Sequence, residues 1–289
     1  SSFYAKTSVS RLSKRRQGGH PLPDQHRFSY RHLDALREDI QARGLDIPLS
    51  ERLDILGSPL ELRNGLTLPN RFAVHPMEGF DSLVDGSPGP LSFRRYRRYA
   101  EGGSALVWFE ATAVLWEARS NPSQLWIHKD NVGAFARLVA ETKARARERY
   151  GHELTMIIQL THSGRYSKPA GIAKPLIAHR SPILDPKHGL TEDYPVLSDA
   201  YLDDLQDTFV AAARLAAEAG FDGVDIKGCH RYLVAELHAS FTRSGRYGGS
   251  FDNRTRLLRE TLARIMDDVP TVCVTTRLNA YDAISYPYG

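Results

Sequence analysis

The densest group of chemically capable side chains in this sequence follows a short apolar stretch near residue 225. Lys227 ends the stretch, His230 follows three residues later, and Tyr232 comes two residues after that. Lys and His can donate hydrogen bonds to a carbonyl oxygen and polarise it. A Tyr hydroxyl, with an ordinary pKa of roughly 10, can deliver a proton at neutral pH. A lone Lys or His is usually a solvated charge, but three such groups at one strand end predict a catalytic site at Lys227, His230 and Tyr232.

The elements that must position this cluster alternate between short apolar strands and amphipathic helices. Such alternation predicts right-handed βαβ units and a parallel sheet. A further helix is expected over residues 30–43, and a hairpin over 59–68 with Asn64-Gly65 as its turn. The strands are expected at residues 71–75, 105–109, 154–160, 221–227 and 271–278, and the helices at 91–100, 131–150, 198–219 and 253–267.

Two parallel architectures compete, and the positions of polar residues separate them. A doubly wound sheet would carry a Gly-rich turn after its first strand, and none is present. Polar residues instead crowd the ends of the predicted strands, where a barrel places its active site. The fold class is therefore predicted as α/β, a (β/α)₈ TIM barrel. About five βα units are present, so roughly three of the eight are expected to be absent. The strand-end residues are Glu78, Glu110, Gln159, Lys227 and Arg277.

Several segments, in order, resemble one enzyme family. Residues 227–233, followed by 246–254, are similar to the signature of old yellow enzymes and related NADH:flavin oxidoreductases. Residues 70–77, 109–112 and 159–165 resemble the first three strands of that family and the loops that follow them. The resemblance spans most of residues 59–289. It implies an FMN-dependent barrel enzyme that takes hydride from NADH or NADPH and passes it to a small electron-poor acceptor, such as an activated alkene.

The resemblance also implies roles for individual residues. Lys227 and His230 occupy the positions that bind the activating group of the acceptor, and Tyr232 matches the proton donor. Arg277 would lie near N1 and O2 of the flavin, where a fixed guanidinium stabilises the charge that develops on reduction. The residues implied to face the flavin are Pro76, Met77, Glu78, Ala111, Gln159 and Arg277.

Three positions depart from the family pattern. Lys227 stands where the family usually has His, and its added charge would favour anionic or more polar acceptors. Arg231 replaces the usual Gly before the Tyr. Glu78 stands where many members carry Thr or Cys near the flavin C4 oxygen. An ionised carboxylate there would oppose flavin reduction, and a protonated one could donate a hydrogen bond; the sequence does not choose between them.

Two alternatives remain open at this point. A lysine on a barrel strand can act as a Schiff-base nucleophile, so Lys227 could serve a lyase of the aldolase type. The chain could also be an inactive barrel fragment, because the strands whose loops commonly hold the FMN phosphate would be absent. Open edges of the first and fifth strands would then favour aggregation, and we expect poor solubility or weak FMN binding of residues 1–289.

The composition of the chain limits which other classes of protein it can belong to. The 289 residues are 42% hydrophobic and 25% charged, as in ordinary globular proteins. Residues 1–45 hold nine Lys or Arg and four acids, a balance of 9 − 4 = +5, and are read as a basic arm and helix ahead of an incomplete barrel domain over 46–289. No nucleic-acid motif, membrane-spanning run or metal-ligand spacing accompanies them, so no nucleic acid, membrane or metal is expected, and the location is predicted as cytoplasmic. Nothing in the sequence indicates an oligomeric state.

Overall fold

A computed structural model describes residues 29–62 and 65–289. The polar, non-periodic residues 1–29 are predicted from the sequence to form a loosely held arm, and all of them except residue 29 lie outside the described ranges. The chain divides into two compact units, residues 1–52 and 53–289, each described here by itself. The described part of the first unit contains helix α1 (Leu33–Ala42), whose first turn is capped by the His32 ring accepting a hydrogen bond from the Ala35 amide at 3.3 Å. The predicted helix over 30–43 is therefore confirmed, in a slightly shorter form.

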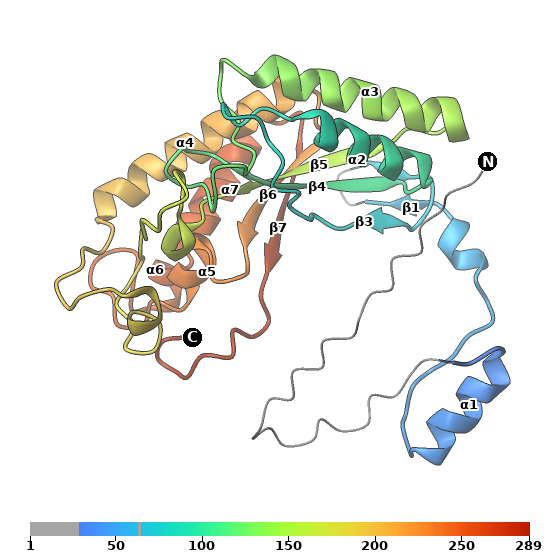
Figure 1. The fold of residues 1–289 in the computed structure, drawn as a ribbon, viewed down its shortest axis with the longest axis horizontal. Helices are drawn as coiled ribbons and strands as arrows, with labels where there is room; N and C mark the ends of the chain where they lie inside the picture. The colour runs from blue at the N-terminus through green and yellow to red at the C-terminus, as the bar shows by residue number, and fades with distance from the viewer. Residues whose placement is uncertain (1–28, 63–64) are drawn as a thin grey trace, which may run out of the picture. The chain divides into compact units, whose positions relative to one another are not determined.

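The second unit is built on a parallel sheet of five strands whose spatial order is the chain order. No strand order reverses, as expected for part of a barrel and not for a doubly wound sheet. Figure 1 shows the sheet curling, since β7 runs at a steep angle to β4 and β5. The fold is a partial (β/α)₈ barrel, as predicted. Its strands are β3 (Ala73–Val74), β4 (Leu106–Ala113), β5 (Thr155–Thr161), β6 (Gly223–Gly228) and β7 (Cys273–Leu278).

Helices follow the strands in turn and pack their apolar faces against the sheet (Figure 1). The Ser198 hydroxyl caps the longest of them by accepting a hydrogen bond from the Tyr201 amide at 3.1 Å. One α-helix was not predicted, a short one directly after Tyr232, and neither were the three 3₁₀ turns. The α-helices of this unit are α2 (Pro90–Glu101), α3 (Val132–Tyr150), α4 (Asp199–Glu218), α5 (Leu233–His238), α6 (Phe251–Arg254) and α7 (Arg256–Asp268), and the 3₁₀ turns are η1 (Asp54–Gly57), η2 (Gly164–Tyr166) and η3 (Pro186–His188).

A two-stranded antiparallel hairpin precedes the sheet, formed by β1 (Leu60–Glu61) and β2 (Thr67–Leu68). The predicted hairpin is confirmed in its strands. Asn64, half of the predicted turn, lies outside the described residues.

The core lies between the sheet and the helices that cover it. Phe109 of β4 stacks on Tyr96 of α2 with ring centroids 4.3 Å apart, and it also contacts Phe135 and Phe221 at 6.2 and 5.1 Å. Aromatic pairs at such distances stabilise a core beyond their buried area. Every residue of β5 is buried, as in a parallel strand covered on both faces. This packing holds the strand ends, and the side chains on them, in fixed positions.

None of the helices within residues 29–62 and 65–289 is long and apolar enough to cross a bilayer. The same residues contain no group of three or more His, Cys, Asp or Glu side chains that could hold a metal ion.

Candidate active site

The residues predicted to form the site come from five different segments and lie at or after the carboxyl ends of strands. Pro76, Met77 and Glu78 follow β3, Ala111 lies on β4 and Gln159 on β5. Lys227 lies on β6 beside Arg277 on β7, since the two are register partners in the parallel ladder. His230 and Tyr232 lie in the turn after β6. Parallel strands present these ends along one edge of the sheet.

Lys227 and Glu78 form an ion pair. The Lys227 ammonium donates to Glu78 Oε1 at 3.1 Å, and the two side chains are only 3% and 12% exposed. Both residues are departures from the family pattern, so two unusual positions on β6 and on the loop after β3 are in direct contact. The charge of Glu78, left open by the sequence, is thus matched by the adjacent cation.

The second oxygen of Glu78 is held by the loop after β4. Gln124 Nε2 donates to Glu78 Oε2 at 3.2 Å, and Ser120 Oγ donates to it at 3.4 Å. Gln124 is itself buried, and its side-chain Oε1 accepts a hydrogen bond from the Ser120 backbone amide at 2.6 Å. Sequence reasoning missed both residues, since no motif marks them and their one signal is that they follow a strand end.

Tyr232 stands at the N-cap of α5, with its ring over the Lys227 ammonium at 4.0 Å. Burial raises the pKa of the Tyr232 phenol, and the Glu78 charge raises it further. The phenol therefore keeps its proton at neutral pH, as an acid must. Tyr232 and Tyr166, with ring centroids 5.9 Å apart, both line an open cleft of about 490 Å³. The other residues of the cleft are Phe80, Ser120, Asn121, Ser123 and Lys168.

The turn between β6 and Tyr232 has an unusual backbone. His230 and Arg231 have φ angles of 60° and 56°, in the left-handed region that favours glycine. The family's Gly at the position of Arg231 would adopt this conformation without strain. The His230 amide donates to Asn279 Oδ1 at 3.1 Å, while its ring is exposed and hydrogen-bonds to no residue in the described ranges. Burial lowers the pKa of His230, and the nearby charges of Lys227 and Arg277 lower it further.

Gln159 lies beside a buried carboxylate that the sequence analysis did not single out. Gln159 Nε2 donates to Asp225 Oδ2 at 2.5 Å, and Trp108 Nε1 donates to the same oxygen at 3.1 Å. The other oxygen of Asp225 is buried and has no partner among the described residues. Burial raises the pKa of Asp225. An unpartnered buried acceptor beside an amide is a position that a donor on a bound group would satisfy.

The remaining predicted cofactor residues offer complementary chemistry for FMN. The Arg277 guanidinium makes no hydrogen bond or ion pair with any residue that the structure describes. Met77 is 68% exposed, an apolar surface that a flat ring would cover. The Ala111 carbonyl accepts from Gln124 Nε2 at 3.3 Å. A cation, an amide and an apolar cover along one sheet edge fit the requirements of an isoalloxazine ring.

A buried ion network anchors the loops around Tyr232. Arg165 is completely buried, donates to Glu236 of α5 at 2.7 Å, and pairs with Asp185 at 2.6 Å. Burial raises the pKa of Glu236 to about 7, although the Arg165 charge opposes this shift. Leu233 donates its amide to the His162 carbonyl at 3.1 Å. The segment that carries Tyr232 is therefore tied to the loop after β5.

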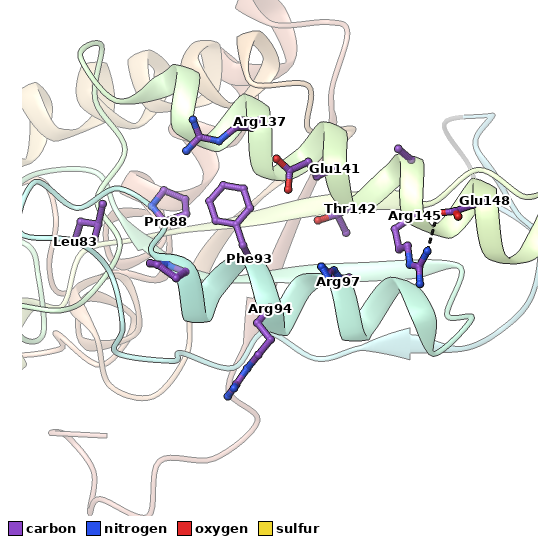
Figure 2. A pocket seen from close by; sticks show the side chains of 12 residues that line it. Leu83, Pro88, Phe93, Arg94, Arg97, Arg137, Glu141, Thr142, Arg145 and Glu148 are labelled. Carbon is purple, nitrogen blue, oxygen red and sulfur yellow. Dashed lines mark hydrogen bonds and ion pairs between the residues drawn. The ribbon is translucent and has the colours of Figure 1, made fainter.

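A larger groove, of about 1210 Å³, lies elsewhere, between α2 and α3. Figure 2 shows Phe93 in its centre with Arg137 nearby, and the guanidinium of Arg137 lies 5.2 Å from the Phe93 ring centroid. Arg145 is paired with Glu148 along the same helix at 2.7 Å. No predicted site residue lines this groove, so its size does not make it the candidate active site.

The model of the NADH:flavin oxidoreductase / NADH oxidase family matches residues 56–286. Among curated proteins, the chain is 34% identical to the NADPH dehydrogenase of Halalkalibacterium halodurans over 204 residues, covering 70% of this chain and 56% of that protein. It is 35% identical to the NADPH dehydrogenase of Bacillus pumilus over 214 residues, covering 72% of this chain and 58% of that protein. The chain thus spans between half and two thirds of the length of these relatives.

Solved structures agree with this match. The old yellow enzyme of Trypanosoma cruzi superposes with a TM-score of 0.64 at 25% identity, over 78% of this chain and 65% of that one. Morphinone reductase in complex with tetrahydroNAD superposes with a TM-score of 0.63 at 25% identity, over 77% and 63% of the two chains. The chain belongs to the NADH:flavin oxidoreductase / NADH oxidase family, whose members are FMN-dependent oxidoreductases of the old yellow enzyme type.

Proposed function

We propose that this protein is an NAD(P)H-dependent flavin oxidoreductase that reduces a small electron-poor acceptor such as an activated alkene. The observation that carries the proposal is the contact between Lys227 and Tyr232. The Lys227 ammonium, a hydrogen-bond donor, lies 4.0 Å from the ring centroid of Tyr232, whose hydroxyl is a proton donor, and Tyr232 lines a cleft of about 490 Å³. This is the pair of groups that an alkene conjugated to a carbonyl requires.

Arg277, Gln159 and the segment after β3 would hold FMN along this edge of the sheet. When bound, FMN supplies a two-electron carrier that accepts hydride from NADH or NADPH and gives it to the acceptor. The Arg277 guanidinium would compensate negative charge that develops on the reduced ring, because it is fixed on β7 without another partner in the described chain.

The acceptor would bind with its activating oxygen toward Lys227. A hydrogen bond from the ammonium draws electron density from the double bond toward that oxygen. One alkene carbon gains hydride and the other gains the proton of the Tyr232 hydroxyl, so that the C=C bond becomes C–C with two new C–H bonds. Burial of Tyr232 supports this role, since a raised pKa keeps the phenol protonated.

The Schiff-base alternative is less well supported. An amine that attacks a carbonyl needs a free lone pair. Lys227 instead donates to Glu78 at 3.1 Å as part of an ion pair. Borohydride reduction in the presence of a carbonyl compound tests this directly, and a stable adduct on Lys227 would favour the lyase.

The proposed function is tested by separating its two half-reactions under anaerobic conditions. Residues 1–289, expressed with whatever chain natively flanks them, should take up FMN and show flavin absorbance. NADH or NADPH should bleach that absorbance, and an enone such as 2-cyclohexenone should restore it. A protein that takes up no FMN, or whose flavin is not reduced by either nucleotide, would refute the proposal. The same titration on residues 1–289 alone tests the expected weak binding.

A further inference from the structure

The Lys227 ammonium is enclosed by two other side chains. The ammonium has one partner on each side, the Glu78 carboxylate at 3.1 Å and the Tyr232 ring at 4.0 Å. An ammonium has three N–H donors, so at least one is left for an acceptor oxygen. Its positive charge, however, is already matched by a carboxylate at contact distance, and little water reaches the pair, since Lys227 is only 3% exposed.

Glu78 cannot easily turn away from Lys227. Its Oε2 accepts from Gln124 Nε2 and Ser120 Oγ at 3.2 and 3.4 Å, so both carboxylate oxygens are held by separate segments. The loop that carries Glu78 is held at the following residue, because the Gly79 amide donates a hydrogen bond to the buried Glu110 carboxylate at 2.8 Å. A ligand that entered beside Lys227 would therefore meet a fixed negative charge as well as the positive one.

Two of the neighbouring groups, the Tyr232 phenol and the His230 ring, add no positive charge to the ion pair, whereas Lys168 lines the cleft next to Tyr232. Burial and the Glu78 charge raise the pKa of Tyr232, which keeps the phenol neutral. Burial lowers the pKa of His230, helped by Lys227 and Arg277, which favours the neutral imidazole at physiological pH. Under the proposed function, the Arg277 guanidinium faces the flavin.

We propose that Glu78 is a specificity-determining residue that makes the acceptor site select a neutral carbonyl over a carboxylate of the same shape. The inference rests on the proposed function, because it concerns the acceptor end of the same site. Without Glu78, the buried ammonium would attract an anionic ligand strongly. With Glu78 held at 3.1 Å, attraction of the ligand to Lys227 is offset by repulsion from Glu78, whereas a neutral oxygen still receives the hydrogen bond. Together, Lys227 and Glu78 thus form a pair without net charge that can still donate a hydrogen bond.

Benzamide and benzoate test this, because they have the same shape, differ in charge and are not reduced. Calorimetry on the oxidised, FMN-loaded protein without a nucleotide should show benzamide binding about tenfold more tightly than benzoate. Glu78→Gln should narrow or reverse that ratio by about tenfold, and Glu78→Asp should retain it, since the charge remains. Glu141→Gln, which removes a carboxylate from the outer helix α3, should leave the ratio unchanged.

A second variant should change the ratio of the two affinities in the opposite direction, which misfolding of the first variant could not explain. Lys227→Gln leaves Glu78 uncompensated and should widen the preference for benzamide by a further factor of about ten. A wild-type preference for benzoate, an unchanged ratio in both variants, or no binding of either ligand to the wild-type protein would overturn the inference. These outcomes do not depend on turnover. The proposed function fails separately, by the absence of FMN uptake or of flavin reduction.

Discussion

Lys227 and Glu78 lie 149 positions apart in the sequence, and their side chains meet at 3.1 Å in a nearly dry ion pair. The sequence resemblance marks both residues as departures from the family pattern, and in the structure each lies next to the charge of the other. A lone ammonium or a lone carboxylate buried here would cost several kcal/mol. Pairing of the two side chains avoids that cost, and the three N–H groups of the ammonium leave at least one free to donate a hydrogen bond to a ligand.

The first prediction concerns this pair. Lys227→Met and Glu78→Leu should each destabilise the protein by about 3–5 kcal/mol, because each leaves an uncompensated buried charge. The double variant should cost less than the sum of the two, with a coupling free energy of about 1–3 kcal/mol in a urea unfolding cycle. The exposed pair Arg147–Glu153 at 2.7 Å is the control, and its coupling free energy should be much smaller, because solvent screens both charges. Equal coupling energies for the two pairs would contradict the interpretation.

The second prediction concerns Arg231, which has φ = 56° where the family has Gly. A non-glycine residue in the left-handed region costs about 1–2 kcal/mol. Arg231→Gly should therefore stabilise the protein by about 1 kcal/mol, after the larger chain entropy of Gly in the unfolded state is subtracted. Thermal unfolding measures this as a rise in Tm. Arg94→Gly within helix α2 is the control, and it should lower stability by about 1 kcal/mol. A fall in Tm for Arg231→Gly would show that the Arg231 side chain outweighs the backbone strain.

Much of this fold could be predicted from the sequence because its signals are local. Apolar runs of strand length alternate with amphipathic helices, and Ser198 carries the side chain that caps α4. These features depend on residues close together in the chain, where propensity and periodicity act. The helix α5 was missed because it has six residues and is almost entirely buried, so no polar face reveals its period.

The contacts within the site could not be predicted in the same way. That Glu78 would contact Lys227, and that Gln124 would donate a hydrogen bond to Glu78, depends on how the loops after β3 and β4 fold toward the end of β6. Asp225 was passed over because a single acid within an apolar strand carries no periodic signal. The sequence gives the strand ends at which such residues stand, while the partners across the sheet edge follow only from tertiary packing.

The third prediction separates the role of Tyr232 from that of the cofactor. Tyr232→Phe removes the proton donor and keeps the ring over Lys227 at 4.0 Å. Reoxidation of reduced flavin by an enone should slow by about 10²- to 10⁴-fold, the usual contribution of a general acid. Reduction of the flavin by NAD(P)H should change little, because that step needs no proton from Tyr232. Stopped-flow absorbance measures both rates, and equal slowing of both would assign Tyr232 to flavin binding.

The fourth prediction concerns pH and the buried His162. Its ring bonds to the Tyr201 hydroxyl at 2.9 Å and accepts from the Gly164 amide at 3.0 Å, and burial lowers the pKa of His162 to about 3 from 6.5. The folded state thus resists protonation, while the unfolded chain takes up a proton below pH 6.5. Stability from this group is present above pH 6.5 and is lost as the pH falls toward 3.

Between pH 7 and pH 5, His162 alone should cost the wild-type protein about 2 kcal/mol of unfolding free energy. Over the same pH interval, the unfolding free energy of His162→Gln should fall by about 2 kcal/mol less than that of the wild-type protein. This holds whatever the stability of the variant at pH 7. Urea unfolding of both proteins at several pH values measures the difference between their pH profiles. Titratable groups that have the same environment in both proteins cancel in that difference. Parallel pH profiles for the two proteins would contradict the prediction, because they would show that His162 takes up its proton at the same pH in the folded protein as in the unfolded chain.

The last prediction tests how the loop after β5 positions Tyr232. Gly164 has φ = 58°, and a Cβ there would lie 2.9 Å from the backbone nitrogen and Cα of Leu233, the residue after Tyr232. Backbone atoms cannot move aside as a flexible side chain can, so Gly164→Ala should displace the start of α5. We expect a loss of about 1–3 kcal/mol in stability and a slowing of enone reduction by at least about tenfold. Gly133→Ala in helix α3 is the matched control, because its Cβ meets nothing within 4 Å and the change should stabilise the helix by about 0.5–1 kcal/mol. Normal enone reduction in Gly164→Ala would mean that Tyr232 is placed by the Arg165–Glu236 pair and not by the close approach of the two backbones.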